Sequence, residues 1–149
     1  MSRRGAVSGE PCFLVDTSTW VLSLRKDGSP EAAAWLREAL AEEKVIMAPL
    51  VKVELLLGSR DKAHYDALKR ELDVLPQLST TDRVYEQTAG LAFNLRRKGR
   101  TIPLIDALIA AFAITHSCIL VHHDRHYELI RETLPDCGLQ TLVVPAFAD

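Results

Sequence analysis

Residues 103–124 read PLIDALIAAFAITHSCILVHHD and carry a helix pattern followed at once by a strand pattern. Pro103 is suited to opening a helix, and the residues after it are apolar on all sides except at Asp106, which predicts a buried helix. The run at residues 118–121 is short and apolar and predicts a buried strand. A buried helix that leads into a buried strand favours a parallel α/β sheet covered on both faces.

The rest of the chain continues this alternation. We expect strands near residues 12–16, 45–48, 73–75, 118–122 and 139–144, and helices near residues 18–26, 31–43, 49–58, 61–72, 81–98, 103–115 and 125–134. Gly99 ends one long helix and Pro103 starts the next, which predicts a helical hairpin. Together the segments predict a three-layer α/β/α domain with a central parallel sheet of four to five strands.

Length and composition predict one soluble domain over residues 12–149, after a flexible leader over residues 1–11. The chain has 149 residues, of which 48% are hydrophobic and 26% are charged, as in ordinary globular proteins. Its formal net charge of −2 gives no overall attraction to nucleic acid. Any binding of nucleic acid must therefore come from a local basic patch.

The cysteines and the hydropathy of the chain indicate in which cellular compartment the protein is expected. The three cysteines show no CxxC spacing, which predicts reduced thiols and not a disulfide framework. The longest apolar stretch, residues 104–115, is too short to span a membrane and contains Asp106. The polar N-terminus lacks the apolar core of a signal peptide. We therefore expect a cytoplasmic protein.

Four carboxylates are expected at one edge of this sheet, namely Asp16, Glu54, Asp106 and Asp124. Asp16 and Asp124 follow strand patterns, whereas Glu54 and Asp106 lie in helices that begin just before them. Strand ends and the N-termini of crossover helices meet at the edge where α/β proteins bind ligands. Carboxylates at close range repel one another unless a cation neutralises them, and Mg²⁺ prefers oxygen ligands. The pattern predicts a site for a hard divalent cation.

Each acid also has a simpler interpretation. Asp16 and Asp124 could merely cap the helices that follow them, and Glu54 could be a solvated residue on a narrow polar helix face. Asp106 is hardest to explain in this way, because an ionised carboxylate in a buried helix is costly unless it is paired or bound to metal. The helix N-terminus would favour it by only about 0.3–1 kcal/mol. The acids are informative chiefly as a group.

The stretches FLVDTSTW, PLVKVELLLGSR, GRTIPLIDALIAAFA and VHHDRHYELI resemble the PIN-domain nucleases in their order and spacing. Within that family the resemblance is to VapC-type toxins of type II toxin–antitoxin systems, and it covers residues 12–144. It implies a PIN-like fold with a catalytic and metal-binding set of Asp16, Glu54, Asp106 and Asp124, supported by Thr17 and Ser18. Two positions depart from the family pattern. His122 stands where many members carry Thr, and His126 stands where another acid often follows.

The resemblance also implies a reaction and partners. Mg²⁺, with Mn²⁺ as a substitute, would activate a water for the hydrolysis of RNA phosphodiester bonds, so the protein is expected to be an endoribonuclease. One or two ions would be bound. The expected protein partners are a cognate antitoxin and a second copy of the chain in a homodimer.

A basic run at the expected hairpin suggests where RNA would bind. It consists of Arg96, Arg97, Lys98 and Arg100, at the end of the first helix and near the start of the second. The run would lie beside Asp106, where a phosphate backbone needs cations. The same residues could instead complement the dipole of the first helix.

Three histidines near the last acid, His122, His123 and His126, suggest a possible zinc site. Neighbouring residues on a strand face opposite ways, and no Cys or second His lies at a recognised zinc spacing. We therefore do not expect these histidines to hold a structural zinc ion. His126 is expected to pack at the junction after the strand or to tune proton transfer near the metal.

Three other functions fit parts of the pattern. A phosphohydrolase of the haloacid dehalogenase type also begins with a strand-end Asp, but its chemistry needs a second Asp where this chain has Ser18. A non-catalytic binding module could use the acids to hold an ion. A PIN nuclease in RNA processing or maturation would share the site of a toxin but not its biology.

Overall fold

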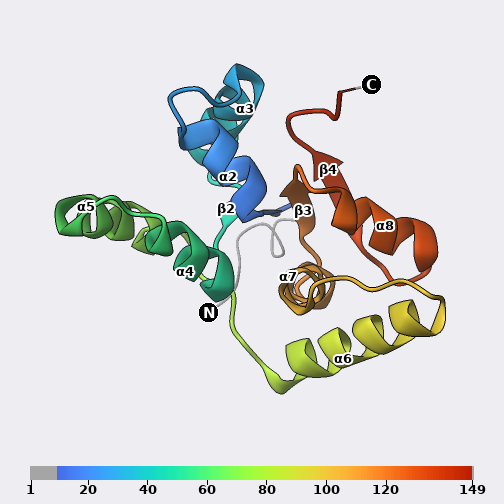
Figure 1. Cartoon of the computed structure of the whole chain (residues 1–149). Coiled ribbons are helices and arrows are strands. Elements are labelled where there is room, and N and C mark those ends of the chain that lie inside the picture. The colour runs from blue at the N-terminus through green and yellow to red at the C-terminus, as the bar shows by residue number, and fades with distance from the viewer. Residues whose placement is uncertain (1–9, 149) are drawn as a thin grey trace.

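Four parallel strands form the sheet, in the order β2-β1-β3-β4, in a computed structural model that describes residues 10–148. The strands are β1 (Phe13–Val15), β2 (Val45–Ile46), β3 (Ile119–His122) and β4 (Gln140–Val143). Phe13 pairs with Val45 on one side and with Ile119 on the other, so β1 and β3 lie at the centre (Figure 1). Most of the expected leader, residues 1–9, falls outside the described residues.

Helices connect the strands and cover both faces of the sheet. They are α2 (Thr17–Leu24), α3 (Pro30–Ala41), α4 (Pro49–Leu57), α5 (Lys62–Asp73), α6 (Asp82–Arg97), α7 (Leu104–Thr115) and α8 (Arg125–Thr133). Figure 1 shows α2 and α3 on one side of the sheet and α7, with α6 outside it, on the other. The expected three-layer α/β/α fold is confirmed. Among the described residues, no helix is both long and apolar enough to cross a membrane.

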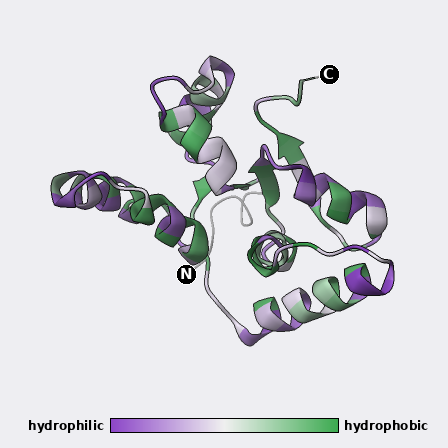
Figure 2. Ribbon diagram, viewed as in Figure 1, coloured by the Kyte–Doolittle hydropathy of each residue, from purple (hydrophilic) through white to green (hydrophobic). Residues whose placement is uncertain are grey.

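The buried helix predicted from the apolar run is α7. Ala107, Ile109 and Phe112 are at most 2% exposed, and Figure 2 shows the strong hydrophobic colouring of this helix beside the mixed colouring of α6. The first turn is different, because Leu104 and Ile105 are 69% and 46% exposed. Asp106 therefore lies at the border of the core, where solvent and ligands can reach it.

Local signals set where several helices start. Ser29 accepts a hydrogen bond from the N–H of Ala32, and Pro30 opens α3. Asp16 and Asp124 cap α2 and α8 by accepting hydrogen bonds from backbone N–H groups in the first turn. The capping interpretation is thus correct for both acids. It also fixes their carboxylates beside the strand ends.

The expected hairpin between α6 and α7 is present. Gly99 has a φ of 78°, in the left-handed region that favours glycine, and the N–H of Arg100 donates to the carbonyl oxygen of Leu95 at 2.9 Å. The loop after this turn leads into α7, which packs against α6. It places the start of α7 near the strand ends that carry the other acids.

The prediction of a strand over residues 73–75 is wrong. Asp73 is the last residue of α5, and Val74 is 82% exposed. The Asp73 carboxylate pairs with Lys69, one turn earlier on α5, and with Lys52 on α4, and both contacts suit its position at the end of the helix. Extended pairing occurs only further along, where Met47 and Gln77 form an isolated parallel bridge.

Candidate metal centre

Two acids follow the central strands at the same edge of the sheet. Val15 pairs with Val121, Asp16 directly follows β1, and Asp124 lies just beyond the end of β3. The N–H of Asp16 donates to the carbonyl oxygen of Val121 at 2.8 Å, which joins the two segments. The carboxyl ends of neighbouring parallel strands therefore place both acids in one region.

Asp16 is 5% exposed, and both of its carboxylate oxygens accept hydrogen bonds. Oδ2 accepts from the Ser18 hydroxyl at 2.5 Å, and Oδ1 accepts from the Tyr127 hydroxyl at 2.8 Å. The Ser18 oxygen also accepts from the N–H of His123 at 3.0 Å, which links the loops after β1 and β3. Burial first, and then the charge of Asp16, raises the pKa of Tyr127. Its phenol therefore remains a hydrogen-bond donor.

Asp106, Asp124 and His126 form a group whose potential ligand atoms all lie within 4.8 Å of one another. Nδ1 of His126 lies 2.7 Å from Oδ2 of Asp106 and 3.3 Å from Oδ1 of Asp124. The side chains of Asp106, Asp124 and His126 are 15%, 35% and 44% exposed. This partial exposure allows an ion and a substrate to reach them.

Electrostatic interactions link Asp106 to the other acids. Burial raises the pKa of Asp106, the hydrogen bond from His126 opposes this effect, and the negative charges of Asp124 and Asp16 raise the pKa further. Burial is the largest cause of this shift, and repulsion between the nearby carboxylates adds to it. Three of the four predicted acids are therefore close enough to interact.

Glu54 is connected to the site through Thr17. The Thr17 hydroxyl donates to Oε1 of Glu54 at 2.6 Å, and Thr17 directly follows Asp16. Glu54 lies on α4, which packs against α2. It is not a member of the group formed by Asp106, Asp124 and His126. Glu54 is thus the least directly connected of the four acids.

The three histidines contact three different partners. Nε2 of His122 lies 2.7 Å from Glu128, Nδ1 of His123 lies 2.7 Å from the carbonyl oxygen of Pro145, and His126 faces Asp106. The rings therefore do not converge on one point. His126 is not among the site residues predicted from the sequence. The available signal is its place two residues after Asp124, in the first turn of α8.

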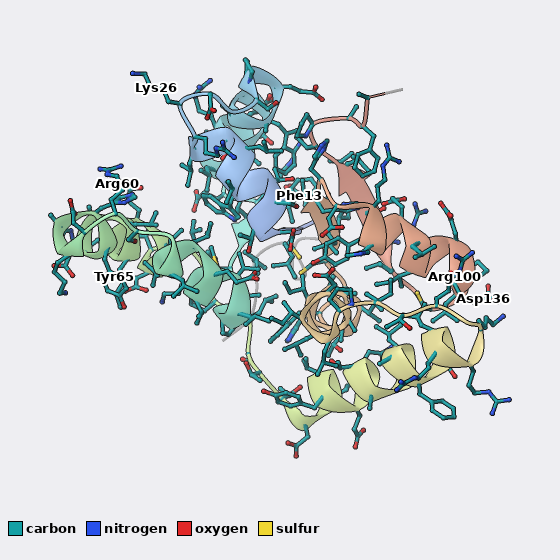
Figure 3. The ribbon with its side chains drawn as sticks, viewed as in Figure 1. Phe13, Lys26, Arg60, Tyr65, Arg100 and Asp136 are labelled. Atoms are coloured by element: carbon teal, nitrogen blue, oxygen red, sulfur yellow. The ribbon has the colours of Figure 1, made fainter. Side chains whose placement is uncertain are left out.

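The basic run divides between separate surfaces. Arg96 and Arg100 line a cavity of about 200 Å³ with Leu104, near the start of α7. Lys98 lines another cavity, of about 600 Å³, together with Asp136. The Arg97 guanidinium lies 5.7 Å from the ring centre of Phe93 on the same helix. Figure 3 shows Arg100 at the outer end of the hairpin loop. Only Arg96 and Arg100 border the segment that carries Asp106.

The donor set suits a divalent cation. Carboxylate oxygens are typical ligands of Mg²⁺ and Mn²⁺, and an imidazole nitrogen is compatible with a transition-metal ion. A cation there would offset the negative charges of Asp124 and Asp16, which add to the effect of burial in raising the pKa of Asp106. The geometry therefore fits a metal held mainly by the group around Asp106.

Comparison with known proteins identifies the family. A family model described as PIN domain matches residues 13–132. This chain belongs to the PIN-domain family. The family assignment confirms the resemblance seen in the sequence and excludes the haloacid dehalogenase type of phosphohydrolase.

Similar proteins agree with this assignment. VapC ribonuclease Mb1587 of Mycobacterium bovis and ribonuclease VapC11 of Mycobacterium tuberculosis are each 37% identical over 122 residues, which cover 79% of this chain and 90% of theirs. The VapBC2 structure from Rickettsia felis, bound to a promoter DNA fragment, matches with a TM-score of 0.72 at 20% identity and covers 89% of this chain and 98% of that one. The FitAcB structure from Neisseria gonorrhoeae matches with a TM-score of 0.66 at 20% identity, over 87% and 96% of the two chains. These structures share the fold of this PIN-domain protein.

Proposed function

We propose that this protein is a divalent-metal-dependent endoribonuclease that acts as the toxin of a toxin–antitoxin pair. The observation that carries the proposal is the group of Asp106, Asp124 and His126 at the sheet edge next to Asp16. RNA as the substrate is supported by the similarity to proteins named VapC ribonucleases, at 37% identity over 122 residues. The expected cytoplasmic location is consistent with such a role and remains a prediction.

The residues of the site divide into ligands and groups that orient them. Asp106, Asp124 and His126 would hold Mg²⁺ or Mn²⁺, with Asp16 and Glu54 beside them. Such an ion supplies an activated water and offsets the charge that develops on the phosphate. The hydroxyls of Ser18 and Tyr127 donate to separate oxygens of Asp16 and hold it in one orientation.

Water is the expected nucleophile. The Ser18 hydroxyl donates its one proton to Asp16 and accepts from the N–H of His123, so these two hydrogen bonds hold it between the loops after β1 and β3. The Thr17 hydroxyl donates to Glu54. Both hydroxyls are therefore assigned to positioning the acids and not to attack on phosphorus.

The substitution Asp16→Asn tests the proposed activity. Asn keeps the size of the side chain and one oxygen for capping α2, but it removes the charge. Cleavage of total RNA in Mg²⁺ should fall by about tenfold or more, because the acids act as a charged set. Circular dichroism should show an unchanged fold, and EDTA should abolish cleavage by the wild type.

A matched control is Asp66→Asn on α5. Asp66 pairs with Lys62 at the surface, where an ion pair contributes little. This variant should cleave RNA like the wild type. Equal cleavage by Asp16→Asn and wild type, or full activity in EDTA, would contradict the metal-nuclease proposal.

The proposed protein partner is a small antitoxin. An apolar groove of about 520 Å³ lies between α4 and α5 and is lined by Val53, Leu56, Leu57 and Tyr65. Leu57 is 84% exposed, which is unusual for a large apolar residue. An amphipathic antitoxin segment would cover such a groove. The structurally similar VapBC-5 of Mycobacterium tuberculosis is described as a member of the VapBC family of toxin-antitoxin systems, which supports this choice of occupant.

Co-expression separates this toxin from a PIN nuclease of RNA processing or maturation. A toxin should form a stable complex with the product of the neighbouring reading frame and should lose cleavage activity in that complex. A processing nuclease should cleave RNA without any dedicated inhibitor.

A further inference from the structure

His122 is a fully buried polar residue at the end of β3. Its relative exposure is 0%, and its ring centre lies 4.9 Å from that of Tyr127. A buried imidazole is costly unless both of its nitrogens are hydrogen-bonded. Both nitrogens of His122 have partners, and one of these partners belongs to the backbone of the candidate metal centre.

The two hydrogen bonds of His122 fix its tautomer. The backbone N–H of Asp124 points to Nδ1 at 3.0 Å, and an N–H group can only donate. Nδ1 is therefore the acceptor, and the ring proton is on Nε2. That proton is donated to Oε2 of Glu128, at 2.7 Å.

Glu128 is in turn held by two other side chains. Its Oε2 also accepts from the Thr141 hydroxyl on β4 at 2.7 Å, and its Oε1 accepts from Arg131 on α8 at 2.9 Å. The strand β3, the helix α8 and the strand β4 are thus joined through one carboxylate. The turn between β3 and α8 carries Asp124. The hydrogen bonds of His122 and Glu128 tie this turn to α8 and β4.

We propose that His122 and Glu128 are a positioning pair that holds the Asp124 turn in the geometry needed for metal binding. This inference rests on the proposed function, because it assigns Asp124 to the metal. His122 does not itself touch the carboxylates of Asp106 or Asp124 through its side chain. It acts through the backbone of Asp124 and is therefore not a ligand. Replacing a residue that orients a metal ligand commonly weakens metal affinity by about tenfold or more.

Two amide substitutions separate the two halves of the pair. In His122→Asn, the side-chain oxygen can take the place of Nδ1 and accept from Asp124, but the side chain is too short to reach Glu128. In His122→Gln, the end of the side chain can take the place of Nε2 and reach Glu128, but the acceptor for Asp124 is lost. The control His116→Asn changes another histidine, one whose partner is the carbonyl oxygen of Ser79.

Calorimetric titration with Mn²⁺ measures the effect without RNA. We expect His122→Gln to weaken Mn²⁺ binding by about tenfold or more, because it removes the acceptor for the N–H of Asp124. We expect His122→Asn to weaken binding less, by about threefold, because it keeps that acceptor and loses only the link to Glu128. The control variant should bind like the wild type. Equal affinities of the two His122 variants, or losses that simply follow their melting temperatures, would show a purely structural role and overturn the proposal.

Two further measurements keep the proposal testable if the His122 variants do not fold. Nitrogen NMR of the wild type should show the His122 proton on Nε2 at neutral pH, and a proton on Nδ1 would overturn the assignment. Thr141→Val removes one hydrogen bond to Glu128 and should weaken Mn²⁺ binding by about twofold or more. Unchanged affinity in this variant would also count against the pair. If these results hold while the wild type cleaves no RNA, the positioning role stands and the proposed nuclease function fails.

Discussion

Metal binding at Asp106 can be tested by measuring the thermal stability of the protein, without an activity assay. Burial raises the pKa of Asp106 most, and the charges of Asp124 and Asp16 raise it further, whereas the hydrogen bond from His126 lowers it. A raised pKa means that the folded protein binds this proton more tightly than the unfolded chain does. The contribution of Asp106 to stability is therefore fully present below the ordinary value of 3.8 and is lost as the pH rises through the raised pKa. At neutral pH without metal, the ionised carboxylate should destabilise the fold.

Asp106→Asn should accordingly hold or raise the melting temperature in EDTA at neutral pH, while RNA cleavage is lost. Mg²⁺ should raise the melting temperature of the wild type, because it binds the folded state, and should raise that of the variant much less. The control is Asp82→Asn, which removes another first-turn acid, on α6. It should lower the melting temperature slightly or not at all, with no dependence on metal. A lower melting temperature for Asp106→Asn in EDTA, together with a wild type that does not respond to Mg²⁺, would mean that the acids are not a metal site.

At the same scale, the sequence predicted some of these contacts and could not predict others. The approach of Asp16 to Asp124 follows from the rule that parallel strands end at one edge, and Asp106 follows from the start signal at Pro103. The link from His122 to Glu128 depends on how α8 and β4 pack against β3, which no local pattern encodes. The contact of His126 with Asp106 has the same origin. The position of Glu54, behind Thr17, likewise depends on the packing of α4 against α2.

The elements α4 and α5 carry the groove proposed for the antitoxin. Leu57→Asp should abolish co-purification of the two proteins, because a charge would be buried in an apolar contact. The melting temperature should change little, since Leu57 is 84% exposed in the isolated chain. Val74→Asp is a matched control, because Val74 is 82% exposed and lies outside the residues that line the groove. Retention of the complex by Leu57→Asp, or equal loss with Val74→Asp, would place the antitoxin elsewhere.

The hairpin of α6 and α7 carries the predicted RNA contacts. Replacing Arg96 and Arg100 by Gln should weaken RNA binding in EDTA and should lower its salt dependence by roughly one unit of slope for each lost phosphate contact. Arg60→Gln is the control, because Figure 3 shows Arg60 on the α4–α5 side of the molecule, away from the hairpin. A salt dependence that is unchanged in the double variant would leave only the helix-dipole interpretation for these two residues.

Sequence patterns were sufficient to predict the boundaries of some helices and turns. Proline, serine and glycine signals located the starts of α3 and α4 and the turn at Gly99, because each acts on the backbone within one turn. The strand expected at residues 73–75 failed for the opposite reason. Its two apolar residues resemble a buried strand, but Asp73 is the last residue of α5 and pairs with Lys69 on that helix and with Lys52 on α4. A short apolar run without flanking signals is therefore ambiguous.

Several large apolar side chains lie exposed on the surface of the molecule. They include Tyr85, Phe93 and Leu104, which are 57%, 60% and 69% exposed. A formal net charge of −2 gives little repulsion between copies. A standard interface takes about 800 Å² from each partner, which is roughly a tenth of the surface of 8773 Å² found here. We therefore expect a homodimer in the absence of antitoxin. Light scattering should give a mass of twice 16.6 kDa at roughly tens of micromolar, and dilution should shift the mass toward that of one chain. A single-chain mass across the whole range would show that the isolated protein is a monomer, and the exposed apolar residues would then have to be covered by other partners.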